Sequence, residues 1–321
     1  MRKAIILVAA SLLASLHAIG GADAQTWPTR PIRAIVPLTA GSAVDIVPRI
    51  VFGQVSAQLG KQIVVENRPG ASGTIGARAV ATAAPDGYTL LAYSSAHTIA
   101  ASTVANLPYD PVKDFDAITA LGSLPTVLTI APSKNIKTIQ ELVALGKTRP
   151  ITFGSIGVGS PIYLAMQRLR LSAGFQVQPI PFKGAPEAVT ETITGRIDVY
   201  YAPVSAALPL IRDGKLIPLV VSSRTRSASL PNVPTTLEAG YANADYNFWI
   251  GVLAPAKTPR PIVDKLNTEI LAALKMPEIQ EKLRKIGVEP LPMSPEQFEA
   301  FLKEDLATNT ALAKAAGLTP H

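Results

Sequence analysis

The sequence predicts an α/β protein made of two domains with a ligand cleft between them. Its 321 residues suit two domains of about 100–200 residues each. Hydrophobic residues make up 48% of the chain and charged residues 17%, a composition that excludes intrinsic disorder. Apolar runs with strand character alternate with helical patterns in two successive blocks. That alternation is typical of α/β domains whose sheets are covered by helices on both faces.

The first block begins at residue 32. Residues 32–37, 62–67 and 89–93 are short apolar runs of the kind found in buried strands. The segments between them, residues 44–59 and 74–83, have a helical pattern. This order predicts parallel βαβ units.

The same alternation restarts at residue 151 and ends in a helical tail. Further strands are expected at residues 151–155, 176–181, 198–202, 215–222 and 247–254, and further helices at residues 161–172 and 185–194. In the tail we expect helices at residues 261–274 and 277–286, and a last helix opened by a capping box at Ser294–Gln297.

The tail contains no predicted strand, so we expect it to return to the first domain. The chain would then cross between the domains twice, near residues 120–126 and near residues 245–251. Residues 25–123 and 249–321 therefore form the first predicted domain, and residues 124–248 form the second. Two crossings between the domains form a hinge. We expect a ligand cleft between the domains, at the carboxyl ends of the strands.

Residues 1–24 have the three regions of a secretory signal peptide. A cationic start precedes an apolar core over residues 4–18, and Ala22-Asp23-Ala24 supplies small residues for cleavage. We expect cleavage after Ala24 and export to the periplasm. The alternative is a membrane anchor, but the apolar core is shorter than the roughly 20 residues that span a bilayer. Cleavage removes a net charge of +1, so +7 becomes 7 − 1 = +6.

The residue inventory excludes several kinds of chemistry. The absence of cysteine rules out disulfides, thiolate metal sites and a cysteine nucleophile. His17 lies in the leader and His321 is the last residue, so only His97 is in the body of the chain. We therefore expect no metal and no cofactor. No basic run follows the leader, which argues against nucleic acid as a partner, although the positive charge can steer small anions.

The loop after the first strand is a candidate anion site. Backbone amides at Gly41, Ser42 and Ala43, with the hydroxyls of Thr39 and Ser42, could cradle an anion at the start of a helix. The alternative is an ordinary helix start, with Ser42 capping the helix and Asp45 in its first turn.

Two further loops are expected to face the same cleft. Ser94 and Ser95 follow the third strand and could donate to a ligand oxygen, whereas His97 is either structural or catalytic. The glycine-rich loop over residues 154–161 offers a second set of amides at a helix start. The chain contains no G-x-S-x-G elbow and no G-x-x-x-x-G-K-[ST] loop, and the glycines at 70, 73 and 76 do not directly follow a strand. Binding of a small anion by a two-lobed periplasmic protein is therefore favoured over catalysis.

An ordered series of motifs resembles one known family. The motifs are Trp27-Pro-Thr-Arg-Pro-Ile32, Ile35-Val-Pro-x-x-x-Gly41-x-x-x-Asp45, Val64-Val-Glu-Asn-Arg-Pro-Gly-Ala-x-Gly73, Ala84-Pro-Asp-Gly-Tyr-Thr-Leu90, Leu107-Pro-Tyr-Asp-Pro111, Pro181-Phe-Lys-Gly184, Leu230-Pro-x-Val-Pro-Thr235 and Glu238-Ala-Gly240. This series, which covers nearly the whole mature chain, resembles the Bug family, the extracytoplasmic solute receptors of tripartite tricarboxylate transporters.

The resemblance implies a type II periplasmic binding fold that closes like a Venus flytrap. It also implies recognition of a carboxylate by backbone amides, hydroxyls and ordered waters. The residues to which this role is assigned are Leu38, Thr39, Ala40, Gly41, Ser42, Ala43, Val44, Asp45, Ser94, Ser95, His97, Ser155, Gly157, Gly159, Ser160, Lys183 and Asp198. The expected partners are a small carboxylate, mono- or dicarboxylate or aromatic, and the membrane subunits of a transporter, with the receptor itself a monomer.

Several positions depart from the family pattern. Leu38 stands where an aromatic residue is usual, Pro48 precedes Arg49 in place of alanine, and Tyr163 stands where a histidine is frequent. These departures point to an atypical solute. The sequence is also consistent with two other functions. One is a sensor role, in which the loaded receptor docks on a sensor kinase, and the other is a hydrolase that uses a serine with His97.

Overall fold

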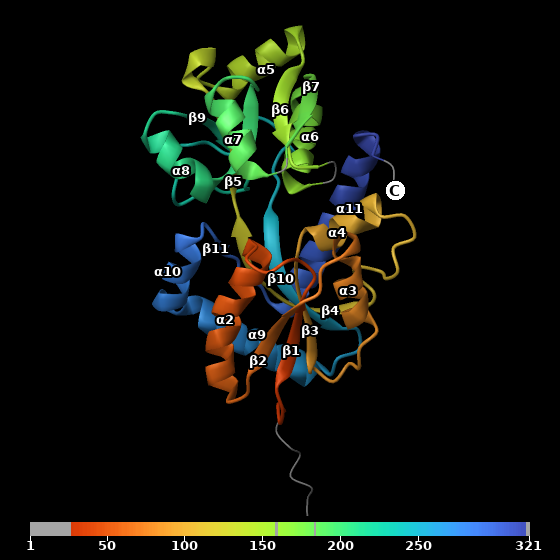
Figure 1. The fold of residues 1–321 in the computed structure, drawn as a ribbon. Coiled ribbons are helices and arrows are strands. Elements are labelled where there is room, and N and C mark those ends of the chain that lie inside the picture. Colours follow the sequence, from red (N-terminus) through yellow and green to blue (C-terminus); the bar gives the residue numbers. More distant parts are fainter. Residues whose placement is uncertain (1–26, 158–159, 183, 319–321) are drawn as a thin grey trace, which may run out of the picture.

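Two lobes, each built on one mixed β-sheet, make up the protein (Figure 1). The structure is a computed structural model and describes residues 27–157, 160–182 and 184–318. The predicted signal peptide and its cleavage site after Ala24 lie outside the described residues. Among the described residues, no helix is both long enough and apolar enough to cross a membrane.

The first lobe contains a six-stranded sheet. In spatial order its strands are β11 (Glu289–Pro290), β4 (Phe115–Leu124), β10 (Phe248–Pro255), β3 (Thr89–Ser94), β1 (Ile32–Val36) and β2 (Ile63–Asn67). β1 pairs in parallel with β2 and β3, whereas β10 runs antiparallel to β3 and β4. The carboxyl ends of β1 and β3 therefore lie at the same edge of the sheet as the end of β4 and the start of β10.

The second lobe contains a five-stranded sheet. In spatial order its strands are β7 (Val177–Pro181), β6 (Ile151–Ser155), β8 (Val199–Pro203), β5 (Thr126–Ile130) and β9 (Ile217–Val221). β6 pairs in parallel with β7 and β8, and β5 runs antiparallel to β8 and β9. The carboxyl ends of β6 and β8 thus lie at the edge where β5 begins, which is the edge nearest the first lobe (Figure 1).

Helices cover the faces of both sheets, as the apolar strands require (Figure 1). In the first lobe they are α2 (Ala43–Leu59), α3 (Thr74–Ala81), α4 (Ala96–Thr103), α9 (Arg260–Lys275), α10 (Pro277–Lys285) and α11 (Pro295–Ala315), with the short η2 (Ala71–Gly73). In the second lobe they are α5 (Ile139–Thr148), α6 (Pro161–Ala173), α7 (Ala185–Ile193) and α8 (Val204–Arg212), with the short η3 (Pro132–Lys134).

The chain passes between the lobes at two places. Pro125 alone separates β4 of the first sheet from β5 of the second, and β10 carries the chain back from residue 248. Crossings were expected near residues 120–126 and 245–251, but no strand was expected between residues 93 and 151. Both β4 and β5 lie between these residues. β4 pairs with β10 and β5 pairs with β8, and both partners come from much later in the chain.

The tail packs mainly on the first lobe, as expected, but its last helix reaches further. Leu302 of α11 belongs to the hydrophobic core of the first lobe, whereas Leu312 belongs to that of the second. The buried carboxylate of Asp305, also on α11, accepts hydrogen bonds from Thr98 Oγ1 at 2.5 Å and Trp249 Nε1 at 3.0 Å. α11 is therefore attached to both lobes. Two residues of the tail also form β11, so the tail adds a short strand to the first sheet.

Candidate ligand-binding site

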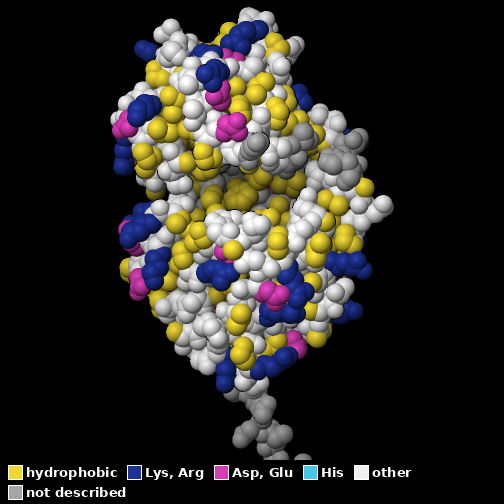
Figure 2. All heavy atoms as spheres, in the orientation of Figure 1, with side chains coloured by type: hydrophobic (Ala, Val, Ile, Leu, Met, Phe, Trp, Pro, Cys, Tyr) yellow, Lys and Arg dark blue, Asp and Glu magenta, His cyan; other side chains and the backbone are white. Residues whose placement is uncertain are grey.

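A hollow lies between the two lobes, and hydrophobic side chains form much of its visible floor (Figure 2). The loop from β1 to α2 and the start of α4 stand at the edge of the first sheet that faces the second lobe (Figure 1). The loop from β6 to α6 stands at the facing edge of the second sheet. The three predicted loops are thus on the walls of one cleft, as expected for the carboxyl ends of parallel strands.

A buried carboxylate holds the first of these loops in place. The carboxylate of Asp45 accepts hydrogen bonds from the amide of Gly41 at 2.9 Å, from Asn67 Nδ2 at 2.9 Å and from Arg49 Nε at 2.8 Å. Asn67 also donates to the carbonyl oxygen of Leu38 at 3.0 Å. Burial would raise the pKa of Asp45, but these hydrogen bonds outweigh burial and lower the pKa below its usual value.

This arrangement corrects part of the predicted anion cradle. The amide of Gly41 is already bonded to Asp45, so it is not available to a ligand in this conformation. Gly41 has a φ of +85°, the left-handed region that favours glycine, and this turns its amide toward Asp45. Asn67 was not among the predicted site residues. Its position at the end of a strand next to β1 is the signal that could have identified it.

The hydroxyl of Ser42 distinguishes this helix start from an ordinary cap. Ser42 has the extended backbone of an N-cap residue at the start of α2, but its side chain makes no capping hydrogen bond. Its Oγ is buried and has no hydrogen-bond partner among the described residues. Leaving a buried hydroxyl unpaired costs about 1–3 kcal/mol, so a ligand that accepts from Ser42 would be favoured.

Ser95 occupies the equivalent place at the start of α4. Its amide donates to the carbonyl oxygen of Trp249 at 3.1 Å, but its buried Oγ has no partner by ordinary hydrogen-bond geometry in the part of the chain that is described. Burial raises the pKa of Tyr246, and the neighbouring Ser95 hydroxyl partly opposes this shift. Ser94 is also buried, and its Oγ accepts weakly from the amide of Ala96 at 3.4 Å.

The second lobe uses its serine hydroxyls within its own loop. Ser160 caps α6 by accepting from the amide of Tyr163 at 3.3 Å, and Ser155 Oγ accepts from the amide of Gly157 at 3.2 Å. The Gly157 amide is therefore occupied, as that of Gly41 is. Gly159 and Lys183, which were also predicted to bind the ligand, lie outside the described residues.

Of the remaining predicted residues in the first loop, Thr39 and Ala40 are exposed, and Leu38 and Ala43 are half-buried. Val44 is buried in the core of the first lobe, so only its backbone could face a ligand.

His97 is a core residue, which corrects its assignment to the ligand site. The side chain is fully buried, and Nε2 donates to the carbonyl oxygen of Pro111 at 2.8 Å. Its ring stacks on Tyr109 at 5.6 Å between centroids and meets the edge of Phe115 at 4.8 Å. Burial lowers the pKa of His97 to about 4, so the ring is neutral at pH 7. Its surroundings give it no access to the cleft.

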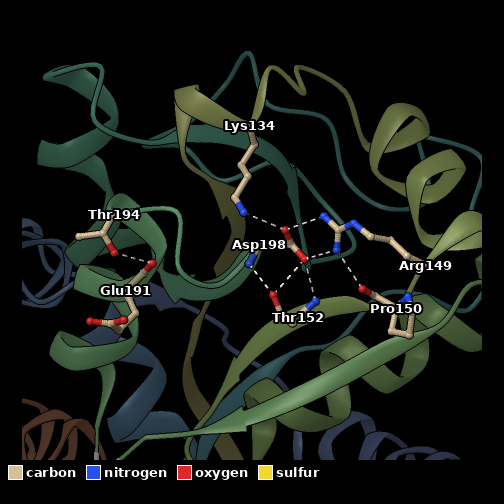
Figure 3. Close-up of polar contacts among 7 residues, drawn as sticks. All are labelled: Lys134, Arg149, Pro150, Thr152, Glu191, Thr194 and Asp198. Carbon is tan, nitrogen blue, oxygen red and sulfur yellow. Dashed lines mark hydrogen bonds and ion pairs between the residues drawn. The ribbon is translucent and has the colours of Figure 1, made fainter.

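Asp198 is the second correction, because it lies at the end of the sheet away from the cleft. Figure 3 shows its carboxylate bound by Lys134, Arg149 and Thr152. β6 and β8 are parallel and Phe153 pairs with Val199, so Asp198 is level with Thr152, toward the amino ends of both strands. Its carboxylate is bound by Arg149 at 2.7 and 2.9 Å, by Lys134 at 3.1 Å and by Thr152 at 2.9 Å. Burial opposes ionisation, but these donors together hold the pKa of Asp198 well below its usual range. Asp198 joins strands of the second lobe and does not face the ligand.

Two α/β lobes joined by two crossings, with helix starts on the walls of the cleft, define a class of protein. This is the class of two-lobed solute receptors with the type II periplasmic binding fold. Over residues 47–318 the sequence matches the family described as tripartite tricarboxylate transporter family receptor, TctC. The chain therefore belongs to that family, of which the Bug proteins are members, and the expectation drawn from its motifs is confirmed.

Relatives and solved structures agree with this assignment. A UPF0065 protein of Bordetella bronchiseptica is 36% identical over 98% of this chain and 93% of its own length. Protein BugT of Bordetella pertussis is 32% identical over 92% of both chains. Among solved structures, R. palustris Rpa4515 with adipate has 30% identity and a TM-score of 0.76, covering 92% of this chain and 100% of that one. MatC from Rhodopseudomonas palustris with bound malate has 28% identity and a TM-score of 0.71, covering 89% and 99%.

Proposed function

We propose that this protein is a periplasmic receptor that captures a small organic acid between its lobes and delivers it to a membrane transporter of the tripartite tricarboxylate type. Binding without catalysis is the proposed activity, and the receptor acts as a monomer. The signal peptide is removed after Ala24, and the domain boundaries lie at residues 123/124 and 248/249, beside the two crossings.

The unpaired hydroxyl of Ser42 is the observation that carries this proposal. It is buried at the start of α2, where the helix dipole favours negative charge. The negative charge of Asp45 close by is balanced by Arg49 at 2.8 Å. Neutral donors, namely hydroxyls and backbone amides, would therefore hold the carboxylate. The relatives solved with adipate and with malate support this, since both of those ligands are dicarboxylates.

Isothermal titration calorimetry with mono-, di- and aromatic carboxylates, adipate and malate included, tests the proposal. Wild-type protein is expected to bind at least one of them saturably. Ser42→Ala and Ser95→Ala should each weaken that binding about tenfold, since one hydrogen bond to a charged group is lost.

Ser133→Ala is the matched control, because Ser133 is exposed on η3 of the second lobe, close to Gly195 and away from the cleft. It should bind like the wild type. Absence of saturable binding to every carboxylate, or equal weakening by Ser133→Ala and Ser42→Ala, would contradict the proposal.

A further inference from the structure

A second cavity lies between the lobes, beside the hinge. Its volume is about 680 Å³, and it is lined by α8 and residues 227–229 of the second lobe and by the end of α10 and β11 of the first. Pro125, at the first crossing, forms part of its wall. Figure 1 shows α8 and α10 on the same side of the molecule, facing each other across the boundary between the lobes. The volume is in the range of small-molecule sites, about 300–1,000 Å³.

Topology separates this cavity from the cleft described above. In the first sheet, β4 and β10 lie between β11, which lines the cavity, and β3 and β1, which carry the loops of the cleft. None of Ser42, Ser95 and Ser155 lines the cavity. A ligand in the cavity would therefore bind on the other side of the crossing strands and would contact both lobes.

The walls combine apolar surface with positive charge. Val204 and Leu208 of α8 and Val288 of the opposite lobe provide the apolar part. Arg284 and Lys285, at the end of α10, provide two cations, both exposed. Arg284 pairs with Glu281 on its own helix, whereas Lys285 has no ion pair with any described residue.

The acidic residue of the cavity, Glu289, forms no ion pair with Arg284 or Lys285. One oxygen of Glu289 accepts from Ser227 Oγ at 2.8 Å and from the amide of Ala228 at 3.2 Å. These two donors come from the second lobe, so Glu289 is engaged across the boundary between the lobes. Because Lys285 forms no ion pair with a described residue, its charge is available to a ligand in the cavity.

We propose that this cavity is a second ligand site, for an organic anion with an apolar body such as a medium-chain monocarboxylate. The anionic group would lie near Lys285 and Arg284, and the chain would pack on Leu208 and the valines. The walls are already held close to each other. Gly287 of the first lobe approaches Ser205 of the second so closely that a Cβ on Gly287 would lie 2.4 Å from Ser205 Cβ. The site is thus preformed in this arrangement of the lobes.

Titration calorimetry with octanoate as the probe tests this site. Wild-type protein is expected to bind octanoate saturably, and the double variant Arg284→Gln/Lys285→Gln should bind it at least tenfold more weakly. Lys282→Gln is the matched control, since it removes one positive charge from the same helix outside this cavity. It should bind octanoate like the wild type.

A second comparison separates this site from the cleft, because octanoate is itself a carboxylate. The octanoate binding that the double variant loses should persist in Ser42→Ala, because Ser42 does not line this cavity. The proposal is overturned if octanoate does not bind saturably, if Ser42→Ala weakens its binding while the double variant does not, or if Lys282→Gln weakens it as much as the double variant. Failure of the carboxylate panel alongside normal octanoate binding would instead contradict only the cleft proposal.

Discussion

The amide of Gly41 donates a 2.9 Å hydrogen bond to the carboxylate of Asp45, which lies in the first turn of the helix that follows. Through this bond and the one from Asn67, a single buried side chain shapes the loop that stands at the cleft. The carboxylate therefore acts on the site through the backbone, as a positioning group.

Replacing this carboxylate with an amide should loosen the loop. Asp45→Asn is expected to destabilise the protein by about 1–3 kcal/mol at pH 7, because hydrogen bonds to a charged group are stronger than those to a neutral one. Carboxylate affinity, measured by calorimetry, should fall with it. Since the folded pKa of Asp45 is lowered, its stabilisation is present above its unfolded pKa, near 4, and is lost as the pH falls through the folded value. Urea unfolding should therefore show that the difference in stability between Asp45→Asn and the wild type shrinks at acidic pH.

Asp264→Asn is the control for this experiment. Asp264 pairs with Arg260 at an exposed position on α9, where ion pairs contribute about 0–1 kcal/mol. Equal behaviour of the two variants would show that the Asp45 carboxylate has no special part in the loop.

The contact between Gly287 and Ser205 should limit how closely the lobes approach. Gly287→Ala places a methyl group 2.4 Å from Ser205 Cβ, at a backbone φ of +75° that favours glycine. We expect a loss of about 1–3 kcal/mol in stability and weaker carboxylate binding, because α8 is pushed away from the first lobe. Adding Ser205→Gly to Gly287→Ala should restore part of the stability and part of the carboxylate affinity.

Gly214→Ala is the matched control for the lobe contact. Gly214 has a φ of +67°, and no atom of the described residues lies within 4 Å of the position that its new methyl group would take. The variant should cost stability through the backbone alone and leave affinity unchanged. If Ser205→Gly restores nothing, the contact does not limit the approach of the lobes.

Removing the Asp198 carboxylate should damage stability without damaging binding. Asp198→Asn weakens the bonds from Arg149 and Lys134 and is expected to cost about 2–4 kcal/mol at pH 7. The difference should shrink as the pH falls below the unfolded value near 4, because the folded pKa is lowered. Carboxylate affinity should remain that of the wild type, because Asp198 lies at the sheet end away from the cleft. A loss of carboxylate affinity without a loss of stability would show that Asp198 contributes to the ligand site.

His97 should make stability depend on pH in a separate window. Its folded pKa of about 4 lies below the ordinary value near 6.5, so only the unfolded chain takes up a proton between these values. Stability is therefore full above pH 6.5 and falls by roughly 3 kcal/mol toward pH 4. His97→Gln, which keeps a donor for the carbonyl of Pro111, should flatten this part of the profile in urea unfolding. A profile identical to the wild type would contradict the buried, neutral state of His97.

The strands and helices of the first block could be predicted because their signals are local. An apolar run at residues 32–37 and a helical pattern at residues 44–59 correspond closely to β1 and α2. β4 and β5 were missed although Thr126–Ile130 is a fully buried run of β-branched and apolar residues, which is the local pattern of a buried strand. The sequence left an anion cradle and an ordinary cap at Ser42 as alternatives, and the folded loop gives Ser42 no capping hydrogen bond.

The two-lobed α/β class, the two crossings between the lobes and the family could be predicted from the sequence, because each depends on the order of residues along the chain. Which predicted polar residues face the cleft was decided only by tertiary structure. His97 and Asp198 are both plausible site residues in the sequence, yet partners distant in the chain, such as Pro111 for one and Arg149 for the other, hold them elsewhere. A buried polar group takes the hydrogen-bond partners that the folded chain places around it. Those partners are contributed by segments that meet only when both lobes have formed.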